Sequence, residues 1–105
     1  MARLRWSLQA AQDLEEICDF LAQDSEQYAS VFAHRVMAII ESIPANPRLG
    51  SMVPEYNRDD LRERLFHNYR IIYRLRGHAV EMVTITHGAR LLPPNLLDEN
   101  EGDQA

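Results

Sequence analysis

The hydrophobic and polar positions of this chain follow a helical period in its first half. Residues 8–22 repeat apolar residues at intervals of three and four, which predicts an amphipathic helix. The apolar positions are Leu14, Ile17, Cys18 and Leu21. Ser7 stands just before this stretch, where its hydroxyl can accept a hydrogen bond from the first helical turn. Residues 2–6 alternate apolar and charged side chains, which predicts a short strand ahead of the helix.

A longer apolar stripe predicts a second helix that ends at Pro44. Its members are Tyr28, Phe32, Val36, Ile39 and Ile43, flanked by Ala29, Ala33 and Ile40. This helix is expected to begin near Asp24 or Ser25, with Gln27 three residues after Asp24 as in a capping box. Because the link between the two helices is very short, they should form an antiparallel hairpin.

The second half of the chain changes to strand-like segments. Residues 61–66, 69–76 and 79–87 are rich in β-branched and aromatic residues, and two residues separate each segment from the next. The spacing predicts three antiparallel strands joined by two-residue hairpin turns. Asn68 is expected to tolerate a positive φ in the first turn, and Gly77 suits the first central position of a type II′ turn in the second.

These segments predict one α+β domain with the order β-α-α-β-β-β, in which a helical hairpin packs on one face of a small antiparallel sheet. The domain is expected to span residues 1–97. Residues 44–60 hold three of the five prolines, so they should form a long ordered loop that crosses the sheet edge, or a hinge-like lid. Residues 98–105 are acidic and lack an apolar anchor, and we expect them to be disordered.

Strand alternation divides the side chains of the predicted sheet between two faces. With two-residue turns, Arg70 lies between Leu65 and Ile85, and Arg74 lies opposite Glu81. One face then carries Arg70, Arg74, Arg76, Glu63, Glu81 and His87. The other carries Tyr69, Ile71, Tyr73, Leu75, Val80 and Met82, with Arg62 and Arg64 there by parity, and should receive the helices. The polar face is either a solvated surface with cross-strand ion pairs, each contributing at most ~1 kcal/mol, or a functional surface.

Charge is unevenly distributed along the chain. The net charge is −5 and all eleven basic residues are arginine, yet residues 58–76 carry a local positive excess. The exclusive use of arginine reflects either a GC-rich genome or a need for bidentate contacts to phosphate or carboxylate. No stretch has the length and apolar character of a signal peptide or a membrane span, and the single cysteine, Cys18, fits a reducing compartment. A soluble, cytoplasmic protein is therefore expected, with Cys18 as a small buried hydrophobe.

Glu63, Arg70 and His87 on one face would suit the cleavage of RNA. The carboxylate would take the proton of a 2′-hydroxyl, Arg70 would stabilise charge on the phosphate, and His87 would protonate the leaving oxygen. Patterns for other chemistries are missing, because the sequence has no Gly-rich phosphate loop, no HExxH motif and no zinc-type spacing of Cys and His. We expect no metal and no cofactor.

Several motifs resemble the RelE/ParE superfamily of toxins. The most specific are the Tyr-Arg-Ile-Ile-Tyr-Arg run at residues 69–74 and the His-x-x-Arg ending at residues 87–90. Residues 6–17 resemble the first helix of the superfamily, and Pro47-Arg-Leu-Gly and Val53-Pro-Glu resemble its loop. The resemblance covers nearly the whole chain and implies the fold already predicted. It also implies the toxin of a type II toxin–antitoxin system, held inactive by a cognate antitoxin that lies against the helix pair or adds to the sheet.

The superfamily divides by target, since RelE-like and YoeB-like members cut messenger RNA on the ribosome and ParE-like members poison DNA gyrase. The strand at 69–74 and the ending at 87–90 resemble the ParE side. An acidic protein without lysine is also poorly suited to ribosomal RNA, where phosphate contacts dominate affinity. The resemblance therefore favours a gyrase inhibitor that performs no chemistry and needs no sequence-specific DNA binding. Its candidate target-binding residues are Arg70, Arg74, Glu81, His87 and Arg90.

Two alternatives remain at this point. Arg70 and His87 resemble the arginine and histidine of YoeB-like nucleases, with Glu55 or Glu63 as the base, which would make the protein a ribosome-dependent endoribonuclease. The chain could also be an inactive or purely structural homologue. The sequence does not identify the residues that bind the antitoxin.

Overall fold

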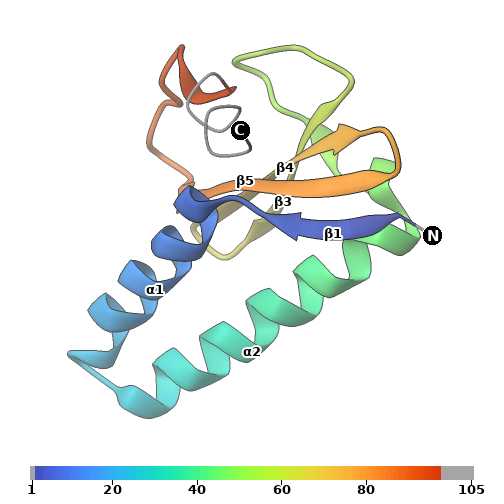
Figure 1. Cartoon of the computed structure of the whole chain (residues 1–105). Helices are drawn as coiled ribbons and strands as arrows, with labels where there is room; N and C mark the ends of the chain where they lie inside the picture. The colour runs from blue at the N-terminus through green and yellow to red at the C-terminus, as the bar shows by residue number, and fades with distance from the viewer. Residues whose placement is uncertain (1, 98–105) are drawn as a thin grey trace.

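The computed structural model describes residues 2–97, and the segment 98–105, for which we expect disorder, lies outside the described residues. The helices and strands are β1 (Arg3–Trp6), α1 (Leu8–Ala22), α2 (Glu26–Ser42), β2 (Ser51–Met52), β3 (Leu61–Phe66), β4 (Tyr69–Arg76) and β5 (Ala79–His87). Two short 3-10 helices, Ile43–Ala45 and Pro47–Leu49, lie between α2 and β2. The strands form a single sheet in the order β1-β5-β4-β3-β2, with α1 and α2 covering one face as an antiparallel pair (Figure 1).

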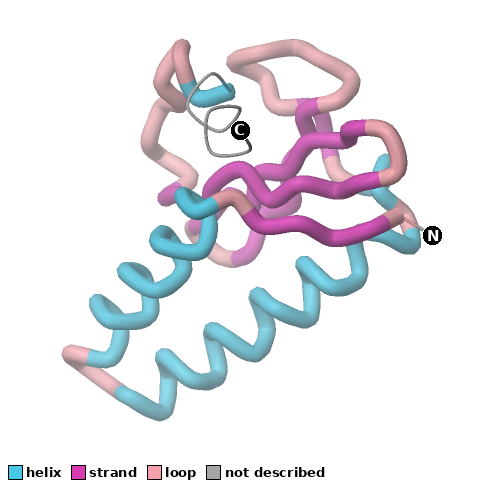
Figure 2. The backbone as a smooth tube through the Cα atoms, in the orientation of Figure 1, coloured by secondary structure: helices cyan, strands magenta, loops and turns pink. Residues whose placement is uncertain are grey.

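The sheet is mixed rather than wholly antiparallel, which corrects one part of the sequence prediction. β1 lies at the edge of the sheet and pairs parallel with β5, whereas the other neighbouring strands are antiparallel. A parallel neighbour needs a long crossover connection, and here the chain between β1 and the three-strand meander supplies it through both helices. Figure 2 shows this arrangement, with the strands in one layer and the helices in another. The predicted order of elements is confirmed.

Serine caps fix where both helices begin. The Ser7 hydroxyl accepts a hydrogen bond from the Ala10 amide at 3.0 Å and donates one to the Val83 carbonyl at 2.9 Å. The cap therefore also ties the start of α1 to β5. Ser25, rather than Asp24, caps α2 by accepting from the Tyr28 amide at 3.0 Å.

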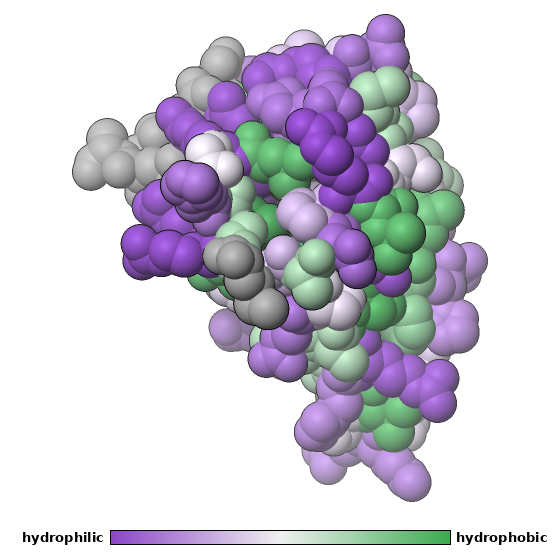
Figure 3. All heavy atoms as spheres, turned by 90° about the vertical axis from the view of Figure 1, so that its right-hand side faces the viewer, coloured by the Kyte–Doolittle hydropathy of each residue, from purple (hydrophilic) through white to green (hydrophobic). Residues whose placement is uncertain are grey.

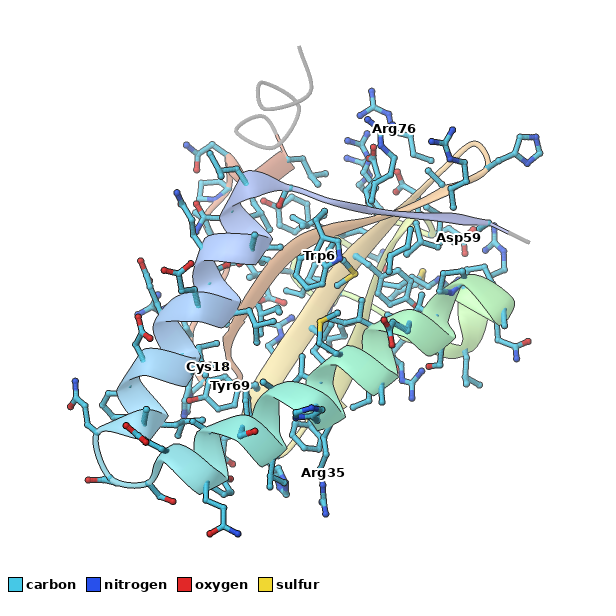
Figure 4. The ribbon with its side chains drawn as sticks, turned by 60° about the horizontal axis from the view of Figure 1, so that its bottom comes forward. Trp6, Cys18, Arg35, Asp59, Tyr69 and Arg76 are labelled. Carbon is cyan, nitrogen blue, oxygen red and sulfur yellow. The ribbon has the colours of Figure 1, made fainter. Side chains whose placement is uncertain are left out.

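The main core lies between the helices and the sheet, as the alternation predicts. Phe32, Val36 and Ile40 of α2 are buried there, and the sheet contributes Ile71, Tyr73, Val80, Met82 and Ile85. The Phe32 ring lies 5.5 Å from Phe66 and 5.2 Å from Tyr69 between ring centroids. Figure 4 shows Trp6 and Tyr69 on this inner side of the sheet, while Arg35 of α2 points away from it.

A second, smaller core covers part of the opposite face, which the sequence analysis treats as polar. Its buried residues are Val53, Leu61, Ile72, Val83, Leu96 and Leu97. Ile72, Leu61 and Val83 come from the sheet, and two segments, residues 53–56 and 92–97, close over them. The apolar residues among the arginines on this face explain why it is not simply solvated. On the side of the molecule that Figure 3 shows, hydrophilic residues gather over the upper part, with apolar residues among them.

The predicted loop at 44–60 is ordered by hydrogen bonds from the sheet edge. The Tyr73 hydroxyl donates to the Pro47 carbonyl at 2.6 Å and accepts from the Gly50 amide at 3.2 Å. The Arg62 guanidinium donates to the Gly50 carbonyl at 2.9 Å and to Asp59. A Cβ at position 50 would lie 2.4 Å from the Tyr73 hydroxyl, so only glycine fits there. Arg62 thus serves the loop, although its parity places it on the helix side.

A bulge in β5 changes the register that the sequence predicts. β3 and β4 pair as expected, and Arg74 lies opposite Glu81. A shift between Ile72 and Tyr73 then places Arg70 opposite Thr86 instead of Ile85. His87 consequently lies opposite Tyr69, not diagonal to Arg70 on the polar face.

The turns and the bulge have local explanations. Gly77 has a φ of 60°, as predicted, but in the first turn the positive φ belongs to His67 at 52° and not to Asn68. Beside the bulge, the Asp13 carboxylate of α1 accepts hydrogen bonds from the Ile85 amide at 3.1 Å and from the Thr84 hydroxyl. One side chain of α1 therefore satisfies polar groups of the irregular strand.

Replacing Asp13 by Ala should lower the free energy of unfolding by about 1–3 kcal/mol, because the Ile85 amide and the Thr84 hydroxyl lose their acceptor. Urea denaturation followed by circular dichroism measures this change. The matched control is Glu15→Ala on the exposed face of the same helix, which should shift stability by no more than about 0.5 kcal/mol. Equal midpoints for the two variants would contradict the role assigned to Asp13.

Candidate functional site

The residues predicted for the polar face separate into two groups along the strands. The first group lies near the β3–β4 turn and consists of Glu63, Arg70, His87 and Arg90, which border one shallow depression together with Glu55 and Leu91. The second group consists of Arg74 and Glu81, which lie farther along β4 and β5 and do not border that depression. The predicted surface is therefore two neighbouring sites rather than one.

Arg70 is the centre of the first group and is held by two carboxylates. Its Nη1 and Nη2 donate to the two oxygens of Glu55 at 2.7 and 2.8 Å, which is a bidentate pair. Its Nε donates to Glu63 Oε1 at 2.7 Å, and Nη2 lies 2.6 Å from the same oxygen. The arginine is 6% exposed. The register places Glu63 on the strand beside it, as predicted, whereas Glu55 arrives from the loop after β2.

These contacts shift the pKa of Glu55 and the pKa of Arg70 in opposite directions. The hydrogen bond from Arg70 lowers the pKa of Glu55 from 4.5 to about 2, against the opposing effect of burial. The same pairing with Glu55, followed by Glu63, raises the pKa of Arg70. A carboxylate with so low a pKa is a weak proton acceptor at neutral pH. Glu55 is therefore held as a charged partner of Arg70 and is poorly suited to act as a general base.

His87 stands at the exposed end of β5, apart from the contacts of Arg70. Its ring lies 5.7 Å from that of Tyr69 in an edge-to-face arrangement. The Ala89 amide donates to its Nδ1 at 3.2 Å, so this ring nitrogen acts as an acceptor. Arg90 and Leu91 follow and are also exposed, with Leu91 80% accessible. Residues 87–91 therefore form the accessible rim of the depression.

The C-terminal segment 92–97 is attached to the Arg70 group. The Leu92 amide lies 3.4 Å from Glu55 Oε2, and the Tyr56 hydroxyl donates to the Pro93 carbonyl at 2.5 Å. From the sequence, Glu55 is a candidate only for a catalytic base, and its structural role is not predicted. The Val53-Pro-Glu motif could have indicated this role. A buried Val53 anchors the loop on the sheet, and this places the carboxylate of Glu55 two residues later near Arg70.

The second group surrounds Glu81, which is 4% exposed. Arg5 Nη1 lies 3.6 Å from Glu81 Oε2, and Arg76 Nη1 lies 3.8 Å from Oε1. Arg74 is opposite Glu81 in the sheet and has its Nε 3.6 Å from Asp60. Arg5 is not among the predicted site residues, because the sequence does not reveal the parallel pairing that brings β1 beside β5.

Other candidate chemistries receive no support from the described part of the chain. Within residues 2–97, no group of three or more His, Cys, Asp or Glu side chains is arranged to hold a metal ion. None of the helices in that range is long and apolar enough to cross a membrane. Cys18 is partly buried against the main core, and burial raises the pKa of its thiol, so it packs as a small apolar side chain.

Comparisons with known proteins agree with this fold. The sequence model of the ParE toxin of type II toxin–antitoxin systems (parDE) matches residues 4–92, and the chain therefore belongs to the ParE toxin family. A solved chain of the chromosomal ParDE toxin–antitoxin system from P. aeruginosa superposes with a TM-score of 0.70 at 18% sequence identity. The match covers 83% of this chain and 96% of that one, and it shows that the two share a fold. No curated protein matches the chain.

Replacing Glu55 by Gln should flatten the acid dependence of stability. A carboxyl whose pKa falls to about 2 in the folded protein stabilises it above its usual pKa of 4.5, and that contribution is lost as the pH falls toward 2. Wild type should therefore lose more unfolding free energy than Glu55→Gln between about pH 5 and pH 2. Urea denaturation at stepped pH measures both curves. Glu41→Gln, at an exposed position of α2, should follow wild type, and parallel curves for wild type and Glu55→Gln would refute the assignment.

Proposed function

Because the chain belongs to the ParE toxin family, we propose that it poisons DNA gyrase in the cytoplasm and is neutralised by a cognate antitoxin. The observation that carries this proposal is the family match over residues 4–92, which spans the helices, the sheet and the rim at residues 87–91. The solved ParDE system with the same fold supports an antitoxin as the partner. In this proposal the toxin acts by binding and performs no chemical step.

The state of Arg70 favours binding over RNA cleavage. Its guanidinium already donates to Glu55 and Glu63, so a phosphate would have to displace at least one carboxylate to reach it. The low pKa of Glu55 makes that residue a weak base. His87 also lies opposite Tyr69 rather than beside Arg70 in the sheet.

Exposure divides the candidate target-binding residues. His87 and Arg90 are exposed, whereas Arg70 and Glu81 are buried and the Arg74 side chain is 12% accessible. We therefore assign direct contact with the target to His87 and Arg90. Leu91 borders the same depression and is exposed. An exposed aliphatic side chain next to an arginine is a combination typical of protein-binding surfaces.

The alternative function is ribosome-dependent cleavage of messenger RNA. One observation favours it, since Glu63, Arg70 and His87 border the same depression. In that case a substrate phosphate would displace a carboxylate from Arg70, and the phosphate would then lie near all three residues. This alternative predicts that translated messages are cut, whereas the gyrase proposal predicts that they remain intact.

Purified toxin added to gyrase, ATP and plasmid should trap cleaved DNA, because a gyrase poison stabilises the broken intermediate. Agarose gels after protein digestion measure linear plasmid, and addition of purified antitoxin should abolish it. Messages in cells that express the toxin should remain intact by primer extension. Unaffected supercoiling would sink the gyrase proposal, and cuts at codon positions would establish the nuclease instead.

The double variant His87→Ala, Arg90→Ala should need about tenfold more toxin for the same trapping, which corresponds to a combined loss of ~1.4 kcal/mol of binding free energy. His34→Ala, Arg35→Ala is the matched control, since it removes the same residue types from exposed positions of α2 on the other side of the molecule. Circular dichroism confirms that both variants fold. A control variant as weak as the test variant would contradict the assignment of residues 87–91.

A further inference from the structure

The rim at residues 87–91, to which we assign contact with the target, has little packing of its own. Arg90 and Leu91 are exposed, and Leu91 is 80% accessible. At the start of the rim, directly after β5, the Gly88 amide donates to the Asn68 carbonyl at 2.6 Å. This bond fixes where the rim begins. The position of its other end must therefore come from the chain that follows.

The chain that follows the rim has restricted backbone freedom. Leu92, Pro93 and Pro94 come directly after Leu91. The two rings fix φ at Pro93 and Pro94, and each proline disfavours helical backbone angles in the residue before it. A contact that holds the Pro93 carbonyl therefore limits where Leu91 can lie, two residues earlier.

The Tyr56 hydroxyl makes such a contact. It donates a hydrogen bond to the Pro93 carbonyl at 2.5 Å. The Tyr56 ring is half-buried against the second core, as is the side chain of Leu92. The Leu92 amide in turn lies 3.4 Å from Oε2 of Glu55, so neighbouring residues of the loop hold neighbouring residues of the C-terminal segment. Figure 1 shows the two segments on the same side of the sheet, opposite the helices.

Tyr56 is itself firmly placed. Val53 is fully buried, and its amide donates to the Leu61 carbonyl of β3 at 3.0 Å. The Val53 carbonyl accepts hydrogen bonds from the amides of Tyr56 and Asn57 at 3.2 and 2.9 Å. Asn57 has a φ of 50°, a conformation that asparagine adopts more readily than most residues. Tyr56 thus lies in a turn fixed to β3, and its hydroxyl is a rigid point of attachment.

The contact of Tyr56 has better geometry than the other attachments of this segment. The separation of 3.4 Å between the Leu92 amide and Glu55 is longer than a usual N–H···O bond, whereas 2.5 Å between Tyr56 and Pro93 is within the range of O–H···O bonds. Residues 96–97 are buried in the second core, but they lie beyond both prolines. The bond from Tyr56 is therefore the short anchor that lies nearest to the exposed end of the rim.

We propose that Tyr56 is a positioning residue for the rim at residues 87–91. Its hydroxyl holds the Pro93 carbonyl and thereby keeps Arg90 and Leu91 in the arrangement that the target binds. The effect on target binding rests on the gyrase proposal, whereas the effect on the rim is a property of the toxin alone. The two can therefore be measured separately.

The first experiment replaces Tyr56 by Phe, which keeps the ring and removes the hydroxyl. Amide hydrogen exchange of the full chain, measured by NMR, should become about 2–10-fold faster at Arg90 and Leu92, the increase in local opening expected from the loss of one hydrogen bond. Exchange at Ile71 in the main core should keep its wild-type rate. Tyr28→Phe is the matched control, since it removes the hydroxyl of an exposed tyrosine on α2 and should leave Arg90 and Leu92 unchanged.

The second experiment measures trapping of cleaved plasmid by gyrase. Tyr56→Phe should require several-fold more toxin than wild type, and Tyr28→Phe should match wild type. In the His87→Ala, Arg90→Ala background, Tyr56→Phe should cause little further loss, because the side chains that it positions are gone. A residue that acts only on overall stability would lower trapping by the same factor in both backgrounds.

Three results would overturn the proposal. The first is unchanged exchange at Arg90 and Leu92 in Tyr56→Phe. The second is unchanged trapping by Tyr56→Phe despite faster exchange, and the third is an equal loss of trapping in both backgrounds. A wild-type toxin that traps no cleaved DNA would instead refute the gyrase proposal, and the exchange comparison would still decide whether Tyr56 holds the rim.

Discussion

The pairing of Arg70 with Glu55 and Glu63 is the interaction on which the outer half of the molecule depends. It joins β4 to β3 through Glu63 and to the loop after β2 through Glu55, which in turn faces the Leu92 amide. Removing one partner of such a buried ion pair typically costs about 3–5 kcal/mol, because the remaining charge is left without compensation. The segments 53–56 and 92–97 that these contacts attach also pack over Ile72 and Leu61 in the second core.

This dependence also connects the fold to the proposed function. A nuclease needs an arginine that is free to meet a phosphate and a base whose pKa lies near neutrality, whereas here the arginine is occupied and its partner has a pKa of about 2. A binding toxin instead needs a rigid platform that presents a few accessible side chains. The Arg70 group supplies that rigidity directly behind His87 and Arg90, which fits a surface that recognises a protein target.

The sequence predicts most of the fold because its periodicities are strong, and it fails where the determining signal lies elsewhere. Two-residue turns set the β3–β4 register correctly, including Glu63 beside Arg70. In β5, the run Val83-Thr-Ile-Thr is β-branched at every position, so either parity is acceptable and nothing local reveals the bulge. The bulge becomes visible only with Asp13 of α1, seventy-two positions from Ile85, and it moves His87 away from the predicted face. β2 and the parallel pairing of β1 were missed because a two-residue strand and a parallel contact leave no period in the sequence.

The uneven distribution of charge gives the two candidate surfaces different roles. At the Arg70 end, two carboxylates contact one guanidinium group, so the charges there hold β3, β4 and the loop after β2 together. At the opposite end, Arg5 and Arg76 lie 3.6 and 3.8 Å from the buried Glu81, and Arg58 and Arg74 lie 2.8 and 3.6 Å from Asp60. The longer contacts of Glu81 join β1, β5 and β4, and they leave the side chains of Arg5 and Arg76 about half accessible at the surface.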